Sequence, residues 1–425
     1  MNVFNSLDGP QKLNLFNLFS SGLLFWAGLA SLLPTLPLYI QHVGGDEWVG
    51  TVMAFFAIGL LLSKAPLSKM TDGQGRKRVL LLGMSAIAIA PLGYILFANI
   101  PSLMLFRAIH GVSIAAFATA YSALIVDVSP RHCRGELIGY MSLVNPIGMA
   151  IGPAIGGFLQ QSAGFFPAIL LSAVLGGIGL LFTLRVTETE QDASKLELPN
   201  HPLHEQTQLP HSAPQSIKSQ KFWSLLITPR IRTPAFVLLV IGIAFGTLST
   251  FIPLYILEEG VVLNIGLFYT VAAIMSFSAR LMIGRASDRY GRGIFITASL
   301  ILYGTAMFIL WQANSAPLFL LGAAFQGCGA GMLIPMMSAL MADRAYAHER
   351  GQMFGLCMVG FDVGIAIAGP VMQQLALRIG YGNLFGLVTG MILFGLCIFL
   401  TCSSKDLIYS LKFSLGRAKD IYAVD

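Results

Sequence analysis

The stretch that decides the fold is residues 71–77, which read TDGQGRK, because it recurs 216 residues later at residues 287–293 as SDRYGRG. Three residue types keep their places in both copies: Asp72 and Asp288, Gly75 and Gly291, and Arg76 and Arg292. A shared apolar composition would not align charged residues in register. We therefore infer that the chain contains two repeated halves.

The same offset aligns further residues on both sides of this stretch. It relates residues 37–40 to residues 253–256, both PLYI, Lys64 to Arg280, and Asp127 to Asp343. The repeat therefore extends well beyond the motif, into the segments on both sides of it.

The composition indicates that a lipid bilayer is the solvent for most of the chain. Of its 425 residues, 55% are hydrophobic and 11% are charged, whereas an ordinary soluble domain has about 25% charged residues. The mean hydropathy is +0.74. Apolar segments long enough to cross about 30 Å of hydrocarbon are expected at residues 13–40, 48–70, 79–98, 101–127, 136–160, 165–186, 234–257, 263–284, 294–312, 316–342, 352–376 and 382–402.

These segments predict an all-α membrane protein with twelve transmembrane helices in two pseudo-symmetric six-helix bundles. Two parallel repeats of six membrane spans are the architecture of a transporter whose site lies between the repeats. Backbone groups in lipid must be hydrogen-bonded within the segment, which excludes open strands. We expect an N-terminal bundle at residues 1–187, a polar, Pro-rich cytoplasmic linker at 188–233, a C-terminal bundle at 234–403 and a cytoplasmic tail at 404–425.

The positive charges indicate the orientation of the chain. Of the 26 Lys and Arg residues, three lie inside spans (Lys64, Arg107 and Arg280), Arg378 lies in a loop on the opposite side, and the other 22 lie on the side of both termini. Cytoplasmic loops carry an excess of Lys and Arg. We therefore expect both termini in the cytoplasm and a multi-pass protein of the plasma (inner) membrane.

Four stretches resemble motifs of the major facilitator superfamily. Residues 68–77 and 284–292 are similar to the signature between spans two and three and its second-half copy, although Ser68 and Gly73 stand where the family usually has Gly and Arg. Residues 107–111 (RAIHG) resemble the fourth-span motif linked to proton coupling, and residues 148–157 (GMAIGPAIGG) resemble the fifth-span antiporter motif. The likeness covers nearly the whole chain and implies a twelve-span exporter of the drug:proton antiporter kind.

The paired motifs are interpreted as a cytoplasmic gate. We expect Gly75 to permit a tight turn with positive φ and Arg76 to pair with Asp127 through a charge-assisted bond. The other members of this expected gate are Asp72, Asp288, Gly291, Arg292, Asp343, Lys64 and Arg280. Such pairs would hold the halves together when the cavity faces outward. A topology signal would also explain the cations, but not an Asp at the same place in both halves.

Small residues form a stripe along one face of the fifth span. Gly148, Gly152, Gly156 and Gly157 recur at helical spacing and flank Pro153. Small residues allow helices to approach closely, and Pro153 favours a kink. The stripe therefore either only allows close helix packing, or it also acts as a hinge or as a seal against leak through the transporter.

Asp362, Arg107 and His110 are the candidate proton-coupling and substrate residues. They differ between the halves, because the repeat places Pro146, Ala323 and Gln326 opposite them. A charge near the bilayer centre costs about 2.5–3.5 kcal/mol on insertion scales, so a charged residue at that depth is expected to have a function. Histidine changes its charge near neutral pH. The alternatives are a structural ion pair for the two charges and a structural role for His110.

The aromatic residues Trp26, Tyr39, Tyr121, Tyr140 and Tyr255 lie on spans that commonly line such cavities. They would offer stacking surface to apolar or aromatic compounds. Positions facing lipid or the interface are the alternative for each.

We expect a secondary transporter that works by alternating access and exports small amphipathic or drug-like molecules by proton antiport. A sugar or metabolite transporter of the same superfamily is the alternative. No nucleotide-binding motif, catalytic triad or metal-ligand cluster is found in the sequence, which argues against an enzyme, a cofactor or a metal. The expected partners are a small-molecule substrate and the bilayer, with no nucleic acid, and the expected state is a monomer.

Overall fold

The computed structural model of the chain describes residues 7–130, 133–188, 226–346 and 349–424. Most of the expected linker, residues 189–225, lies outside the described residues. The described part contains 12 helical segments that are long and apolar enough to cross a membrane. They match the twelve expected spans one for one, so the predicted fold class is confirmed.

The described residues of the first half form eight α-helices and one short 3-10 helix. Their bounds are α1 (Gly9–Ser31), α2 (Leu36–His42), η2 (Asp46–Trp48), α3 (Val49–Gln74), α4 (Arg76–Leu96), α5 (Ile100–Val128), α6 (Arg134–Ser142), α7 (Val144–Ala163) and α8 (Phe165–Leu184).

The second half follows the same plan and adds a short helix at its end. Its elements are α10 (Arg232–Glu258), α11 (Ile265–Tyr290), α12 (Arg292–Trp311), α13 (Ala316–Asp343), α14 (Arg350–Ile379), α15 (Tyr381–Cys402) and α16 (Leu407–Ser414).

Two spans of the first half are broken where proline removes a backbone donor. The first span is divided into α1 and α2, and Pro34 and Pro37 lie at this break. The fifth span is divided into α6 and α7, and Pro146 cannot donate to the carbonyl of Ser142 at that junction. Proline lacks the N–H that a continuous helix needs, so both breaks follow from the sequence.

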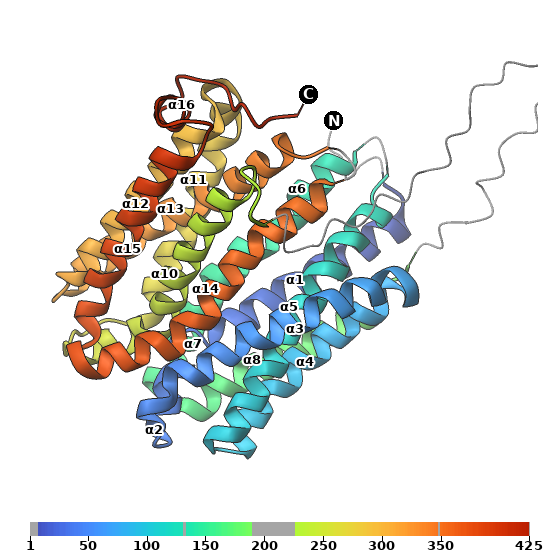
Figure 1. Ribbon diagram of the computed structural model, residues 1–425. Coiled ribbons are helices and arrows are strands. Elements are labelled where there is room, and N and C mark those ends of the chain that lie inside the picture. Colours follow the sequence, from blue (N-terminus) through green and yellow to red (C-terminus); the bar gives the residue numbers. More distant parts are fainter. Residues whose placement is uncertain (1–6, 131–132, 189–225, 347–348, 425) are drawn as a thin grey trace, which may run out of the picture.

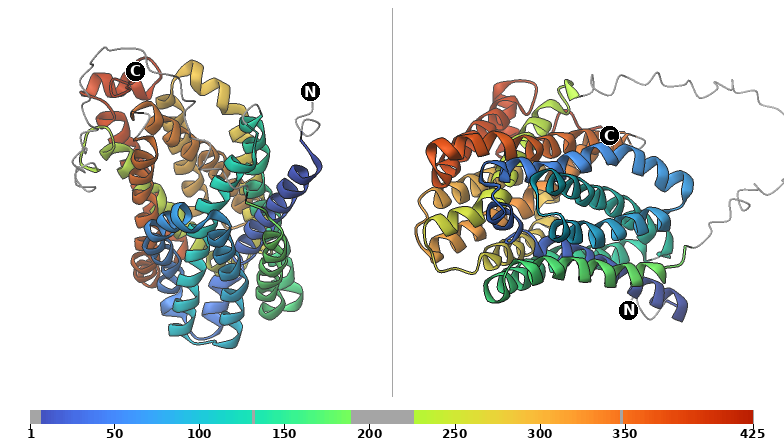
Figure 2. Two further views of the ribbon diagram at one scale, coloured as in Figure 1. Left: turned by 90° about the vertical axis from the view of Figure 1, so that its right-hand side faces the viewer. Right: turned by 90° about the horizontal axis from the view of Figure 1, so that it is seen from below.

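The helices form two bundles, each drawn from one half of the chain. Figure 1 shows the blue-to-green helices of the first half beside the yellow-to-red helices of the second, and Figure 2 shows the same division in two further views. Both termini lie at one end of the molecule. We call this end the termini side and the opposite end the far side.

The tail packs against the second half. Helix α16 contacts α12 and α15, and the Thr297 hydroxyl donates to the Ser414 carbonyl at 2.9 Å. Farther along, the Val424 N–H donates to the carbonyl of Asp343 at 2.8 Å. The expected tail at 404–425 is therefore joined to the C-terminal bundle along its described length.

A buried arginine anchors this tail. Arg344 is fully buried, and its guanidinium donates to both carboxylate oxygens of Asp420, at 2.6 and 3.1 Å. It also donates to the carbonyls of Arg230 and Ser403, at 2.9 and 3.0 Å. These bonds satisfy a charge that would otherwise be costly to bury.

Asp420→Ala is expected to lower the free energy of unfolding by about 3 kcal/mol, because it leaves the Arg344 guanidinium buried without a carboxylate. The measurement is a denaturant titration of the purified protein in detergent micelles. Lys405→Ala, at an exposed residue of the same tail, is the control and should change the stability little. Equal stabilities of the two variants would show that the anchor contributes nothing.

Candidate transport site between the two halves

An ion pair joins the two halves in the middle of the spans. Lys64 on α3 places its Nζ 3.0 Å from Oδ2 of Asp362 on α14. The Asp362 side chain is 6% exposed, whereas that of Lys64 is 44% exposed. At 1.5 Å per residue, Lys64 lies about 22 Å from the far-side start of α3. The candidate coupling carboxylate therefore has a partner, which comes from the other half.

Helices α3 and α14 also touch closely nearer the far side. A Cβ added to Gly50 would overlap the carbonyl of Gly369, and one added to Gly369 would overlap the carbonyl of Gly50. The buried Gln373 side chain accepts from the Gly50 N–H and donates to the Asp46 carbonyl, both at 3.0 Å. We call the contact between α3 and α14 the first seam. The glycine contact and the Gln373 hydrogen bonds close it on the far side.

Helices α7 and α11 form a second seam between the halves. The Thr270 hydroxyl donates to the Ala150 carbonyl at 2.7 Å. A Cβ on Gly266 would overlap the carbonyl of Pro153, and one on Gly157 would meet the backbone of Gly266. Close approach of small residues therefore brings these helices together as well.

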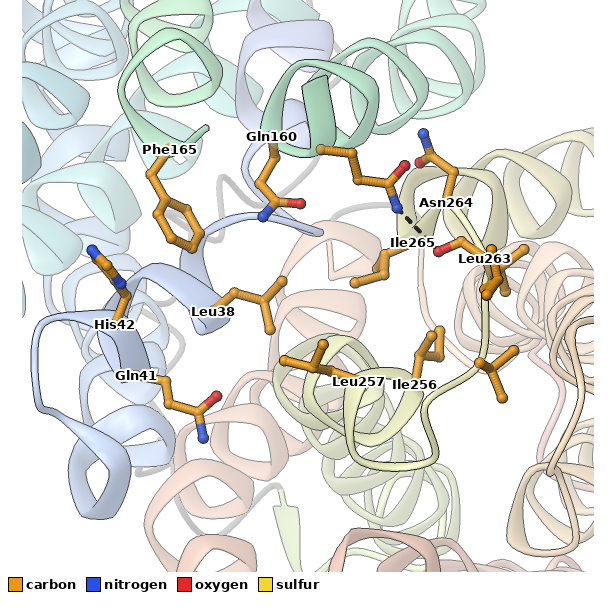
Figure 3. Close-up of a pocket in the computed structure, with 13 residues that line it drawn as sticks. Leu38, Gln41, His42, Gln160, Phe165, Ile256, Leu257, Leu263, Asn264 and Ile265 are labelled. Atoms are coloured by element: carbon orange, nitrogen blue, oxygen red, sulfur yellow. Dashed lines mark hydrogen bonds between the residues drawn. The ribbon is translucent and has the colours of Figure 1, made fainter. Parts of the chain in front are cut away.

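A depression of roughly 510 Å³ lies at the far-side end of this second seam. Figure 3 shows Leu38, His42 and Phe165 of the first half on one side of it and Leu263 and Asn264 of the second half on the other. The Gln161 side chain donates to the Leu263 carbonyl at 3.2 Å. The depression shares no lining residue with the cavity described next, so the two are separate.

A cavity of roughly 200 Å³ lies between the halves. Its walls come from the α1–α2 break and from α7, α10, α11, α12, α13 and α14, and include the apolar residues Met149, Phe245 and Phe361. The polar lining residues are Asn145, Ser249, Tyr269, Ser276, Arg280, Tyr303 and Gln326. A mainly apolar wall with a few polar groups is typical of small-molecule sites.

Arg107 and His110 lie in a different cluster, inside the first half. The Arg107 guanidinium lies 4.5 Å from the centre of the Phe56 ring, and Nδ1 of His110 lies 3.1 Å from the Tyr94 hydroxyl. Both residues are buried, and Nε of Arg107 and Nε2 of His110 have no hydrogen-bond partner in the described protein. The described residues show no bond between this cluster and Asp362, so the three candidates do not form one site here.

The turns expected at the termini side are present in both halves. Gly75 and Gly291 end α3 and α11 with φ of 97° and 85°, values that favour glycine. The next helix begins at once in each case, with Arg76 and Arg292. The first-half and second-half copies therefore fold alike.

The expected ion pairs of these motifs are also present. Arg76 pairs with Asp127, and Nε of Arg292 lies 3.2 Å from Oδ2 of Asp343. The expectation that such pairs hold the halves together needs correction, because each pair joins neighbouring helices of a single bundle, α4 to α5 and α12 to α13.

Four other expected gate residues are distributed differently. The side chains of Asp72 and Asp288 lie outside the part of the structure that is described. Lys64 belongs to the first seam, and Arg280 lines the cavity. The residues of the expected gate thus divide between the termini-side motifs and the region between the halves.

The glycine stripe of the fifth span serves two contacts. Gly148, Gly152 and Gly156 face α1, where an added Cβ would meet the backbone around Ala27 or Ser31. Gly157, together with the carbonyl of Pro153, faces α11 instead. Three glycines therefore pack the first half, and the fourth lies in the contact between the halves.

None of the five aromatic residues expected to line the cavity is among its lining residues. Tyr39, Tyr121 and Tyr255 are buried, and each hydroxyl donates to a backbone carbonyl of its own half. Trp26 packs against aromatic neighbours in the first half, and Tyr140 is 41% exposed. The sequence indicated suitable spans but not which face of each helix looks inward.

Sequence reasoning missed several residues between the halves. It did not identify Gln373 and Thr270, which are uncharged and belong to no motif, or Tyr269, Tyr303 and Gln326 as cavity residues. A polar side chain inside an apolar span was the available signal for each, since such side chains seek partners on other helices.

Comparisons with known proteins agree with this architecture. The family model of the Major Facilitator Superfamily matches residues 18–285 and 262–410. The chain is 28% identical to the multidrug resistance protein MdtG of Enterobacter lignolyticus, over 91% of each chain. It is 26% identical to the MdtG protein of Klebsiella pneumoniae, over 94% of this chain and 96% of that protein. A crystal structure of a mutant of the nucleoside transporter NupG superposes with a TM-score of 0.73 at 14% identity, over 91% of this chain and 99% of that chain.

Gly369→Val is expected to separate the halves on the far side, because the added side chain would overlap the Gly50 carbonyl. The measurement is the distance between spin labels at Glu47→Cys and Val262→Cys, one in each half, in a background with the five native cysteines replaced by serine. The mean distance should increase by a few ångströms.

Gly390→Val on α15 is the matched control, because a Cβ there meets no atom within 4 Å. Distance distributions that are the same in the Gly369 variant, the control and the wild type would show that the Gly50–Gly369 contact does not hold the far side closed.

Proposed function

This chain belongs to the Major Facilitator Superfamily, and from that premise we propose that it exports small amphipathic or drug-like molecules in exchange for protons. The transported molecule would occupy the cavity between the halves, and the halves would alternate between openings to the two sides of the membrane. The chain would lie in the plasma (inner) membrane as a monomer, with both termini in the cytoplasm.

The observation that carries this proposal is the ion pair between Lys64 and Asp362. It crosses from one half to the other, and its carboxylate is almost completely buried. A proton on Asp362 would remove the negative charge and with it the attraction to Lys64. Binding and release of one proton would therefore change how strongly the halves are held together.

The position of the pair supports a role in alternating access. The other contacts of the α3–α14 seam, at Gly50, Gly369 and Gln373, lie nearer the far side. The Lys64 side chain is 44% exposed, and protons would reach the pair along it. The contacts nearer the far side would keep the seam closed there, and loss of the ion pair would release it at mid-depth.

The cavity wall supports amphipathic substrates over sugars. Leu33, Met149, Ile241 and Phe361 give it apolar surface contributed by both halves. Seven polar side chains also line the cavity, but most of its wall is apolar, and an apolar body gains free energy from burial against such a wall. The relatives named as multidrug resistance proteins agree with this substrate class.

Asp362→Asn is expected to abolish efflux driven by a pH gradient, because the amide carries no titratable charge. The measurement uses everted membrane vesicles with an imposed pH gradient and a compound chosen by screening amphipathic acids, bases and neutral molecules against the wild type. Lys64→Gln should reduce coupled efflux strongly while leaving the amount of inserted protein unchanged.

Glu47→Gln, at an exposed carboxylate on the far side, is the control and should transport like the wild type. Efflux by the Asp362 variant that still follows the pH gradient would contradict a coupling role for this carboxylate.

A further inference from the structure

The two seams between the halves are related by the repeat but carry different charges. The offset of 216 residues relates Lys64 to Arg280 and Asp362 to Pro146. The first seam therefore contains a cation and an anion, whereas the second seam has a cation opposite a proline. Both Pro146 and Arg280 line the cavity.

Arg280 is a cation without a partner in the part of the chain that the structure describes. The residue is exposed, lines the cavity and has neither a hydrogen bond nor an ion pair among the described residues. Of the described residues that line the cavity, Arg280 carries a charge and none is acidic. A guanidinium presents five donors in a planar fork that suits carboxylate, phosphonate or sulfonate groups.

Two further polar groups line the same cavity. Nε2 of Gln326 donates to the Tyr303 hydroxyl at 3.2 Å, and this hydroxyl retains its own proton for donation. Phe245 and Phe361 supply apolar surface in the same cavity. The wall thus combines a charged donor with room for an apolar body.

We propose that the cavity selects amphipathic anions, with the acidic group bound by Arg280 and the apolar body packed against Phe245 and Phe361. The inference rests on the proposed function, since it names the substrate class of the same cavity. A cationic substrate would meet Arg280 as a like charge, and the buried carboxylate of Asp362 already has Lys64 as its partner.

The test is equilibrium binding to the purified full chain in detergent, with no pH gradient. The probes are a naphthalene sulfonate, the matching neutral sulfonamide and the matching trimethylammonium compound, which share one aromatic body. The wild type is expected to bind the sulfonate about tenfold more tightly than the sulfonamide, because only the sulfonate brings a negative charge of its own to the guanidinium. Its affinity for the cation should be the weakest.

Arg280→Gln is expected to remove the preference for the sulfonate while lowering the affinity for the sulfonamide much less, and Arg280→Lys should retain part of the preference. Arg378→Gln is the matched control, because Arg378 is exposed at the far-side end of α14 and does not line the cavity. A variant that merely misfolds would lose the sulfonamide as well.

The proposal is overturned if the wild type binds the sulfonate no better than the sulfonamide, if the cation binds best, or if Arg280→Gln keeps the preference. These outcomes concern charge selection alone. Proton coupling is measured separately in vesicles, so either idea can fail while the other stands.

Discussion

A carboxylate at the middle of a membrane needs a partner, and the arrangement of this molecule depends on where Asp362 finds one. An isolated charge at that depth costs a few kcal/mol, and the partner, Lys64, lies on the opposite bundle. The attraction that stabilises Asp362 is therefore the same attraction that holds α14 against α3. The proposed function therefore links the charge state of Asp362 to the relative placement of the two halves.

The internal repeat makes the two seams comparable, and they differ in which charged and polar residues they contain. The α3–α14 seam holds the ion pair and the hydrogen bonds of Gln373. The α7–α11 seam has Pro146 in place of the acid and borders the cavity between the halves. In the proposed function, the first seam would respond to protons, whereas the second would present Arg280 to a ligand.

The sequence predicted most features that depend on segments close together in the chain. It predicted few of the contacts that form when the two bundles pack against each other. The spans follow from apolar length, and the pairing of Arg76 with Asp127 follows from motifs on successive helices. The Lys64–Asp362 pair joins residues 298 positions apart, and only the packing of two complete bundles brings them together. The aromatic residues were misplaced because spans that are apolar all round carry no stripe that marks the inward face.

The contact between Gly50 and Gly369 has a consequence for how this protein can evolve. It is made by backbone atoms, and no residue is smaller than glycine. A side chain gained on one helix therefore cannot be accommodated by trimming the residue opposite, as it can where two large side chains meet. Second-site suppressors of a change at either position have to arise elsewhere, by shifting a whole helix, so both positions are expected to tolerate almost no variation.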